Sequence, residues 1–392
     1  MAERPLTVAW FSYFPVEWLS GVPEPVARLP RQHPASWQRV LLAEFEKNPA
    51  LRLHIVVLRK QFERNLTFQR NGVTFHLVKT PGGLRAPSLF WLDTVLIRRV
   101  LRTVKPDVVH AWGTEQGAAL VANRLGYRRV ATVQGLISWY AKVSPPSWHS
   151  RLAGFLENHT LPRCPLVTAE SRFAVQYLEQ RFPGLQIEHV EHTPDLVFHQ
   201  VVRKPQTSPL RFIFVGAFDH RKGGDLLLSA LDQLKNELQF ELIVVGKPRG
   251  TLLQSLQAGV SAEFWRRIVF KERLTQVEVA QELSAATMIL CPSRADTGPI
   301  AVKEAAVAGV PVIGTAVGGI PDYVSPGRNG VLCSPDNLAG LIEAIRAACL
   351  HPQFSRGQVD MPTLAQTRAY LSPQLMGQKF WGIYQRLHES RS

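Results

Sequence analysis

Short apolar runs alternate with longer segments of helical periodicity along most of the chain. The runs span four to seven residues and are rich in Val, Ile, Leu and Phe, as strands buried in a parallel sheet are. We predict strands at residues 6–12, 53–58, 73–78, 106–110, 129–134, 166–170, 187–191, 210–216, 240–246, 268–271, 286–291 and 310–314. We predict helices at residues 36–47, 91–104, 171–182, 226–234, 275–284, 298–307, 337–350 and 373–389. This alternation is typical of an α/β fold with two doubly wound domains.

A polar stretch with several prolines, from His199 to Pro209, separates the two series of strands. A chain of 392 residues is long enough for two or three domains. We interpret the polar stretch as an interdomain linker and predict one domain at residues 1–200 and a second at residues 201–372.

The most informative stretch runs from Cys291 to Asp322 and reads CPSRADTGPIAVKEAAVAGVPVIGTAVGGIPD. We expect Asp296 and Thr297 to cap a helix whose first turn opens with Gly298. The N–H groups of a helix N-terminus suit a phosphate, and a carboxylate, here Asp296 or Glu304, can accept hydrogen bonds from sugar hydroxyls. Phosphate and polyol together indicate a nucleotide sugar. The simpler alternative makes Asp296 a helix cap and Glu304 a surface acid.

A second motif joins the strand that ends at Gly216 to the helix that follows Asp225. Its turn contains Arg221 and Lys222 ahead of two glycines, which is a suitable arrangement for binding an anion. Lys222 offers a compact charge to a phosphate, and Arg221 can bind two oxygens at once. The alternative is an ordinary exposed basic turn.

These two motifs resemble the donor site of retaining glycosyltransferases of the GT-B fold, family 4. The resemblance rests on P-S-x(4)-G-x(5)-E-A, on the following A-G-V-P-V-I-x-T-x-V-G-G-I-P-D, and on the G-x(5)-K-G turn. It implies two Rossmann-like domains that face each other across a cleft, with the last helix, at residues 373–392, returning to the first domain. By the same resemblance Glu304 holds the ribose, Asp296 contacts the donor sugar and Lys222 holds the diphosphate.

The chain departs from the family pattern at five places. One is Pro299, which removes an N–H group that could serve the donor. Asp296 replaces a Glu, Gln134 replaces a His, and Gly21 is the only glycine where a G-G-x-G turn is usual. Ala217 stands where the family often has Arg, so we expect Arg221 to substitute for it.

Two polar residues mark strand ends in the first domain. Ligands of open parallel sheets bind beyond the carboxyl ends of the strands, which makes His110 and Gln134 candidates to face a substrate. Gln134 precedes Gly135, which indicates a close backbone approach. For both residues the alternative is a buried side chain with hydrogen-bond partners.

The resemblance implies a transferase that moves a hexosyl unit from a UDP- or GDP-sugar to a glycan or lipid-linked acceptor, in cell-envelope or exopolysaccharide synthesis. We assign Asp296, Gln134 and His110 as candidate catalytic residues. The candidate donor-binding residues are Gly216, Arg221, Lys222, Thr297, Gly298 and Glu304. No D-x-D motif stands where it could bind a metal, so we expect neither metal nor cofactor beyond the nucleotide sugar. The alternatives are a non-catalytic GT-B module that binds glycans or a partner enzyme, and a sugar-nucleotide epimerase or phosphorylase.

The formal net charge of +14 attracts anions of every kind. We find no nucleic-acid-binding module and expect no nucleic-acid partner. In the helix at 91–104 we expect one apolar face, formed by Leu92, Val95, Leu96, Val100 and Val104. We expect the opposite face to be basic, with Arg98, Arg99 and Arg102 and, just beyond the helix, Lys105. The basic face is either solvated or a patch for acidic lipid.

The four cysteines lie far apart in the sequence, without a C-x-x-C pair. This pattern favours reduced thiols and argues against a structural zinc site. No signal peptide is predicted, and the longest uncharged run is too broken to span a bilayer. We therefore expect a cytoplasmic protein, peripheral to the inner face of the membrane if the basic helix binds lipid.

Overall fold

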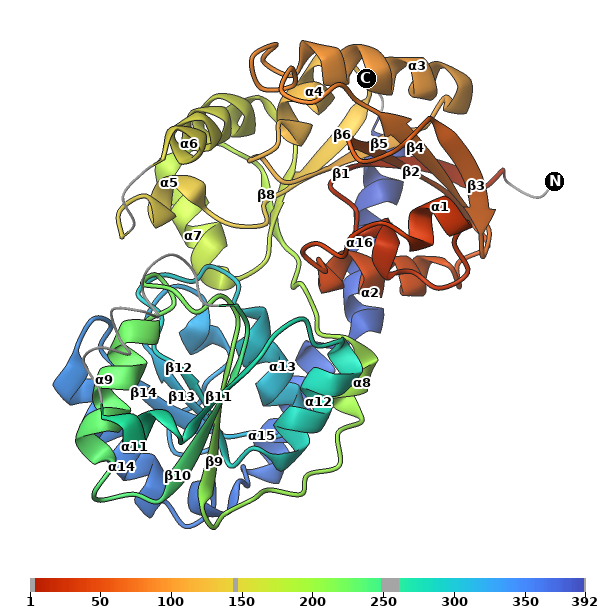
Figure 1. Ribbon diagram of the computed structural model, residues 1–392. Helices are drawn as coiled ribbons and strands as arrows, with labels where there is room; N and C mark the ends of the chain where they lie inside the picture. Colours follow the sequence, from red (N-terminus) through yellow and green to blue (C-terminus); the bar gives the residue numbers. More distant parts are fainter. Residues whose placement is uncertain (1–3, 144–146, 248–260, 391–392) are drawn as a thin grey trace. The chain divides into compact units, whose positions relative to one another are not determined.

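The computed structural model describes residues 4–143, 147–247 and 261–390, and every element below belongs to these ranges. The chain divides into two compact units (Figure 1). One consists of residues 1–141, 145–191 and 373–392, and the other of residues 142–144 and 192–372. The boundary expected after residue 200 therefore lies before His192, and the stretch at 199–209 belongs to the second unit.

The first unit contains a sheet in the order β3-β4-β2-β1-β5-β6-β7-β8, in which only β3 and β4 pair antiparallel. Its strands are β1 (Leu6–Ser12), β2 (Leu51–Arg59), β3 (Leu66–Arg70), β4 (Val73–Lys79), β5 (Val108–Trp112), β6 (Arg128–Thr132), β7 (Val167–Ala169) and β8 (Ile187–His189). Its helices are α1 (Glu24–Ala27), α2 (Ser36–Phe45), α3 (Trp91–Val104), α4 (Ala118–Leu125), α5 (Ile137–Tyr140), α6 (Trp148–Thr160), α7 (Arg172–Arg181) and α16 (Pro373–Glu389), with 3-10 turns at Val16–Trp18 and Leu161–Arg163.

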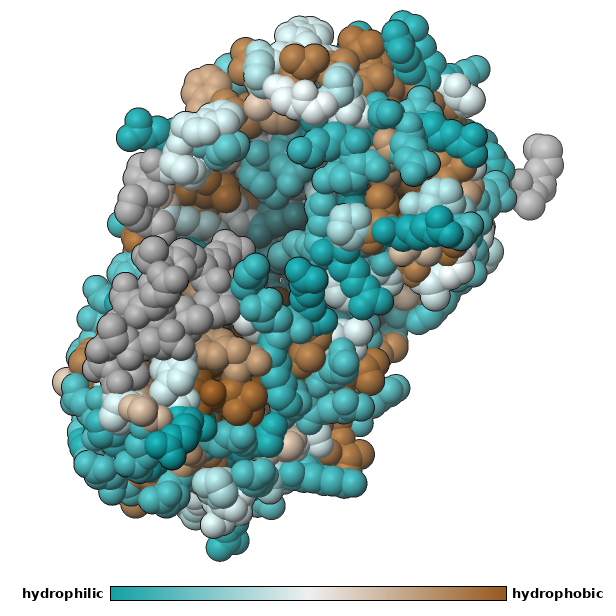
Figure 2. Space-filling model, viewed as in Figure 1, coloured by the Kyte–Doolittle hydropathy of each residue, from teal (hydrophilic) through white to brown (hydrophobic). Residues whose placement is uncertain are grey.

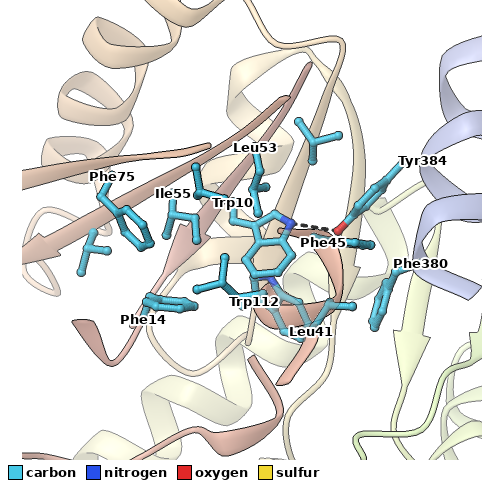
Figure 3. Close-up of a cluster of buried hydrophobic side chains, with 14 of the residues drawn as sticks. Trp10, Phe14, Leu41, Phe45, Leu53, Ile55, Phe75, Trp112, Phe380 and Tyr384 are labelled. Carbon is cyan, nitrogen blue, oxygen red and sulfur yellow. Dashed lines mark hydrogen bonds between the residues drawn. The ribbon is translucent and has the colours of Figure 1, made fainter. Parts of the chain in front are cut away.

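One face of this sheet packs on α2 and α16. Phe380, Ile383 and Tyr384 of α16 are fully buried against Trp10 of β1 and Phe45 of α2. Figure 3 shows this cluster, in which the indole Nε1 of Trp10 donates a 2.9 Å hydrogen bond to the hydroxyl of Tyr384. The last helix of the chain is thus part of the core of the first unit. The opposite face packs on α3, α4, α6 and α7.

The second unit contains a fully parallel sheet in the order β11-β10-β9-β12-β13-β14. Its strands are β9 (Leu210–Val215), β10 (Phe240–Val245), β11 (Ile268–Lys271), β12 (Met288–Cys291), β13 (Val312–Thr315) and β14 (Gly330–Cys333). Its helices are α8 (Leu196–His199), α9 (Gly224–Leu234), α11 (Ala262–Trp265), α12 (Gln276–Ala285), α13 (Ile300–Ala308), α14 (Leu338–Leu350) and α15 (Met361–Tyr370), with 3-10 turns at Ile320–Asp322 and Phe354–Arg356.

The strand order of the second unit reverses between β9 and β12. From β9 the chain proceeds outward to β10 and β11, whereas β12, β13 and β14 extend the other way. Loops at the carboxyl ends of two such strands diverge and leave room for a ligand. The turn after β9 and the turn after β12 carry the two sequence motifs, so the fold brings both motifs to this switch point.

Two local predictions were wrong. No side chain caps α13, because its N-cap position is Pro299, three residues after Asp296. In α3 the buried side is formed by Asp93, Thr94, Ile97 and Leu101, whereas Val95, expected inside, is 42% exposed. No described helix combines the length and the apolar character that crossing a membrane requires.

Candidate functional site

The turn after β9 is folded tightly against the turn after β12. The backbone N–H of Lys222 donates to Oδ1 of Asp219 at 2.9 Å. Gly223 has φ +74°, and a Cβ there would come within 2.0 Å of the carbonyl oxygen of Pro292. Only glycine allows both the left-handed backbone and this approach. The glycine at position 223, directly before α9, is therefore required by the contact between the two turns.

Lys222 and Asp296 form an ion pair between the two turns. Their side chains are 17% and 8% exposed, so the pair is largely shielded from solvent. The two residues are 74 positions apart in the sequence, and the sequence prediction that both motifs meet at one place is consistent with this pair.

Arg221 also connects the two turns, through the backbone. Its guanidinium Nη1 donates to the carbonyl oxygen of Ala295 at 2.8 Å, and the N–H of Arg294 donates to the carbonyl of Arg221 at 2.8 Å. Part of the Arg221 side chain is thus used to hold the loop, and its expected contact with a phosphate stays a prediction.

Sequence reasoning missed Arg294, which lies between the motif residues Ser293 and Ala295. Its guanidinium makes two 2.7 Å hydrogen bonds to the carboxylate of Asp225, one of 2.6 Å to Asp336 and one of 2.6 Å to the carbonyl of His220. The basic residue inside the P-S-R-A-D segment was a signal, but its partners could not be read from the sequence.

Glu304 lies in the second turn of α13 and is 7% exposed. Burial raises the pKa of its carboxyl to about 8, and the negative charge of Asp195 adds to the increase. Asp195 caps α8 by accepting from the N–H of Val197 at 3.1 Å. The alternative of a surface acid is therefore wrong, because Glu304 is buried and keeps its proton at neutral pH.

The remaining donor-side candidates surround these groups. Thr297 is fully buried and Gly298 is half-buried, directly before α13. Gly216 has φ +134°, and its carbonyl oxygen would lie 1.8 Å from a Cβ on Gly246, so the ends of β9 and β10 touch backbone to backbone. Neighbouring Lys303 is also fully buried and donates to the carbonyl oxygen of His192 at 3.1 Å.

His110 does not reach a substrate-facing surface. Its side chain is fully buried in β5, with Nδ1 2.6 Å from the hydroxyl of Tyr384 and Nε2 2.6 Å from that of Thr132. The ring stacks on Trp112 with 4.2 Å between centroids. Both ring nitrogens are engaged in the core, as the buried alternative expects, and this geometry gives no support to the catalytic assignment of His110.

Gln134 follows β6 and is half-buried. Its Nε2 is shielded from solvent, and no hydrogen-bond partner for it lies within the described ranges. A Cβ on the next residue, Gly135, would be 3.1 Å from the ring of Tyr140, so this side chain packs closely on the backbone there. An amide without a partner at the carboxyl end of a strand is available to a ligand.

Three acids that the sequence analysis did not single out lie near one another in the first unit. The pKa of the Glu115 carboxyl is raised by burial and also by the charges of Glu157 and Glu170. Glu157 accepts hydrogen bonds from the N–H groups of Ile137 at 2.8 Å and Ser138 at 3.2 Å.

Within the described residues no group of three or more His, Cys, Asp or Glu side chains is arranged to hold a metal ion.

The fold is that of GT-B proteins. Sucrose-phosphate synthase from Thermosynechococcus elongatus superimposes with a TM-score of 0.80 and 16% identity over 98% of this chain and 100% of that chain. The protein HepE of Anabaena, solved with UDP-glucose, superimposes with a TM-score of 0.68 and 16% identity over 97% and 100% of the two chains.

The sequence comparisons specify the family. The family model described as "Glycosyl transferases group 1" matches residues 209–350, and that described as "Glycosyltransferase Family 4" matches residues 47–196. This chain belongs to the group 1 glycosyltransferases of the GT-B fold.

Curated relatives match over part of their length. Glycogen synthase of Mycobacterium tuberculosis is 25% identical over 71% of this chain, and the match spans 66% of that protein. D-inositol 3-phosphate glycosyltransferase 1 of Catenulispora acidiphila is 33% identical over 34% of this chain and 34% of its own length.

Proposed function

We propose that this protein is a retaining glycosyltransferase that moves a hexosyl unit from a UDP- or GDP-sugar to a glycan or lipid-linked acceptor. The observation that carries the proposal is the Lys222–Asp296 ion pair, which joins the turns after β9 and β12 at the switch point of the second sheet. The donor would bind in this unit, and the first unit would bind the acceptor.

In this proposal each charged group of the donor site has one task. Lys222 binds the diphosphate. The first N–H groups of α13, at the positive end of the helix dipole, stabilise the same negative charge. Glu304 bonds the ribose hydroxyls, and as a neutral acid it can donate as well as accept. Asp296 contacts the donor sugar. Its carboxylate is shorter by one methylene than the family's Glu.

Glycosyl transfer separates an oxocarbenium-like sugar from a departing diphosphate. Lys222 and Arg221 would stabilise the negative charge that grows on the diphosphate, so that no metal ion is needed. Retention of configuration is what the family resemblance implies. Gln134 would hydrogen-bond a hydroxyl of a substrate through its Nε2, since glutamine cannot accept a proton as histidine does.

The solved relatives support the donor class. HepE was solved with UDP and with UDP-glucose, and it shares the fold of this chain. The acceptor and the role in cell-envelope or exopolysaccharide synthesis are inferred from the family. We propose a cytoplasmic location, in keeping with the four free thiols of the described residues.

The test is to measure turnover with a panel of UDP-, GDP- and ADP-sugars. Release of the nucleoside diphosphate is the signal that is measured. We expect Lys222→Ala and Asp296→Asn to lose about a hundredfold or more in kcat/KM, as removal of groups that stabilise transition-state charge does. Lys235→Ala is the matched control, because Lys235 pairs with Asp232 at 2.8 Å in the same unit. The control is expected to keep its activity.

Retained activity in folded Lys222→Ala and Asp296→Asn would contradict the site. Nucleotide binding by the wild type without transfer of any sugar in the panel would favour the non-catalytic alternative. Conversion of a nucleotide sugar into its epimer, without release of the sugar, would favour an epimerase.

A further inference from the structure

Four of the eleven large hydrophobic side chains that the described residues expose fall within one twelve-residue stretch of the first unit. They are Leu84 (55% exposed), Leu89 (48%), Trp91 (54%) and Val95 (42%). Figure 2 shows hydrophobic residues at the surface in the region of α3 and α4, beside hydrophilic ones. Single exposed apolar residues need no explanation, but a cluster of four marks a binding surface.

The backbone before α3 is held in a strained conformation that points alternate side chains in and out. Leu89 and Phe90 have φ values of 45° and 59°, which residues with a side chain rarely adopt. Phe90 is 5% exposed and packs so closely on Gly117 that a Cβ there would meet its ring at 2.4 Å. Leu89 is directed to the surface as a consequence.

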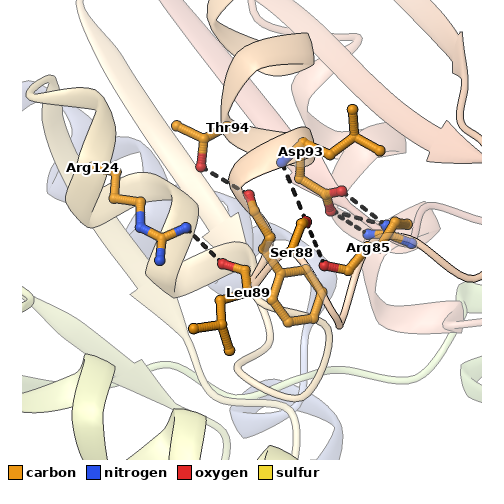
Figure 4. A network of polar contacts seen from close by, with 8 residues as sticks. Arg85, Ser88, Leu89, Asp93, Thr94 and Arg124 are labelled. Atoms are coloured by element: carbon orange, nitrogen blue, oxygen red, sulfur yellow. Dashed lines mark hydrogen bonds and ion pairs between the residues drawn. The ribbon is translucent and has the colours of Figure 1, made fainter.

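Polar contacts fix this turn from both sides (Figure 4). Arg85 binds the buried carboxylate of Asp93 through Nε at 2.9 Å and Nη2 at 2.7 Å. Nη1 of Arg124 donates to the carbonyl oxygen of Leu89 at 2.6 Å, and its guanidinium lies 4.4 Å from the ring of Trp91. The exposed side chains are therefore presented by a braced segment.

The outward stripe of α3 changes from apolar to basic along its length. Trp91, Val95, Arg99 and Arg102 follow one another at spacings of four, four and three residues, so they share one side of the helix. All four are exposed, as is Lys105 directly after the helix. The basic residues are thus continuous with the apolar ones and do not form a separate face.

We propose that this surface, formed by Leu84, Leu89, Trp91, Val95, Arg99, Arg102 and Lys105, docks the protein on an anionic phospholipid bilayer. Aromatic and aliphatic side chains insert at the boundary between headgroups and acyl chains, while Arg and Lys bind the phosphate charge beside them. The net charge of +14 favours approach to such a membrane. Docking needs no donor nucleotide, so it is independent of the transferase chemistry.

The experiment is cosedimentation of the full chain with vesicles of mixed phosphatidylglycerol and phosphatidylcholine, and with pure phosphatidylcholine vesicles. We expect binding to the anionic vesicles only. Trp91→Ser with Val95→Ser, and separately Arg99→Glu with Arg102→Glu, should each weaken it roughly tenfold or more.

The second unit offers matched controls. Val277→Ser with Leu350→Ser removes two exposed hydrophobic residues, and Arg266→Glu with Arg356→Glu reverses two exposed charges. Both should bind within about twofold of the wild type, by the same electrostatic argument. Thermal unfolding checks that every variant folds.

Three outcomes would overturn the proposal. They are no binding of the wild type to anionic vesicles, unchanged binding in both α3 variants, and unchanged binding in Trp91→Ser with Val95→Ser alone. The last result would mean a contact through charge only, such as one with nucleic acid.

Discussion

Glu304 lies in α13 with a carboxyl that burial keeps protonated at neutral pH, its pKa being raised to about 8. The sequence could predict that this residue belongs to the site, because it lies at a fixed spacing from Asp296. It could not predict the protonation state, since the burial of the carboxyl and the nearby charge of Asp195, the N-cap residue of α8, both depend on the fold. In the same way Lys222 and Asp296 could each be singled out, whereas their ion pair required the fold.

Replacement of Glu304 by Gln should change how stability depends on pH. The native carboxyl binds its proton more tightly than the unfolded one, whose pKa lies near 4.5. Between the unfolded pKa of 4.5 and the native pKa of about 8, the free energy of unfolding of the wild type therefore falls as the pH rises. Glu304→Gln removes this slope. The stability of the variant minus that of the wild type should therefore be about 3 kcal/mol larger at pH 8 than at pH 5.

Urea unfolding at both pH values measures the effect. Glu272→Gln, at an exposed position of the same unit, is the control and should run parallel to the wild type. Parallel pH dependence of the wild type and Glu304→Gln would show that the carboxyl is ionised in the native protein.

Among the elements, the end of α13 was predicted to within one residue, at Val307 against Ala308, because Gly309 ends the helix with φ +76°. Its start was predicted at Gly298, two residues before the observed start at Ile300. The expected cap by Asp296 and Thr297 does not form, since the N-cap position is Pro299, which has no polar side chain. In α3 the apolar periodicity indicated the wrong buried side because Arg85 pairs with Asp93 and allows that carboxylate to be buried. β3, α4, α6 and α15 were missed, and β3 is an edge strand without a buried residue.

Arg294 should control the rigidity of the turn after β9. Arg294→Met keeps the length of the side chain but removes its bonds to Asp225, Asp336 and the carbonyl of His220. Stability should fall by about 1–3 kcal/mol, because the partly buried carboxylate of Asp225 loses its donor. The KM for the donor should rise several-fold.

Urea unfolding and donor kinetics check both effects. Arg346→Met is the control, because Arg346 binds Glu237 and Glu343 at the surface, and it should leave stability and KM nearly unchanged. An unchanged KM in Arg294→Met would show that Arg294 does not affect binding of the donor.

At the scale of the whole molecule, the doubly wound class and the two-unit organisation could be predicted from strand–helix alternation. The inclusion of α16 in the first unit was implied only by the family resemblance. Its physical basis is the cluster around Trp10 and Tyr384, whose members come from opposite ends of the chain. No local sequence pattern can predict a contact between residues so far apart in the chain.

Tyr384→Phe should destabilise the first unit. The hydroxyl accepts from Trp10 and lies 2.6 Å from Nδ1 of His110, and without it two buried groups lose a partner. We expect a loss of about 1–3 kcal/mol in the free energy of unfolding. Chemical unfolding followed by tryptophan fluorescence measures it, with Tyr127→Phe, a half-buried tyrosine of the same unit, as control. Equal effects of the two substitutions would contradict a special role of Tyr384.

Calorimetric titration of UDP, GDP and ADP into the wild type, Lys222→Ala and Lys235→Ala tests most directly whether the second unit holds a nucleoside diphosphate. We predict that the wild type and Lys235→Ala bind one of these nucleotides equally well and that Lys222→Ala binds it about tenfold or more weakly, since the diphosphate loses its ammonium partner. Absence of binding by the wild type, or equal affinity of Lys222→Ala, would contradict the account.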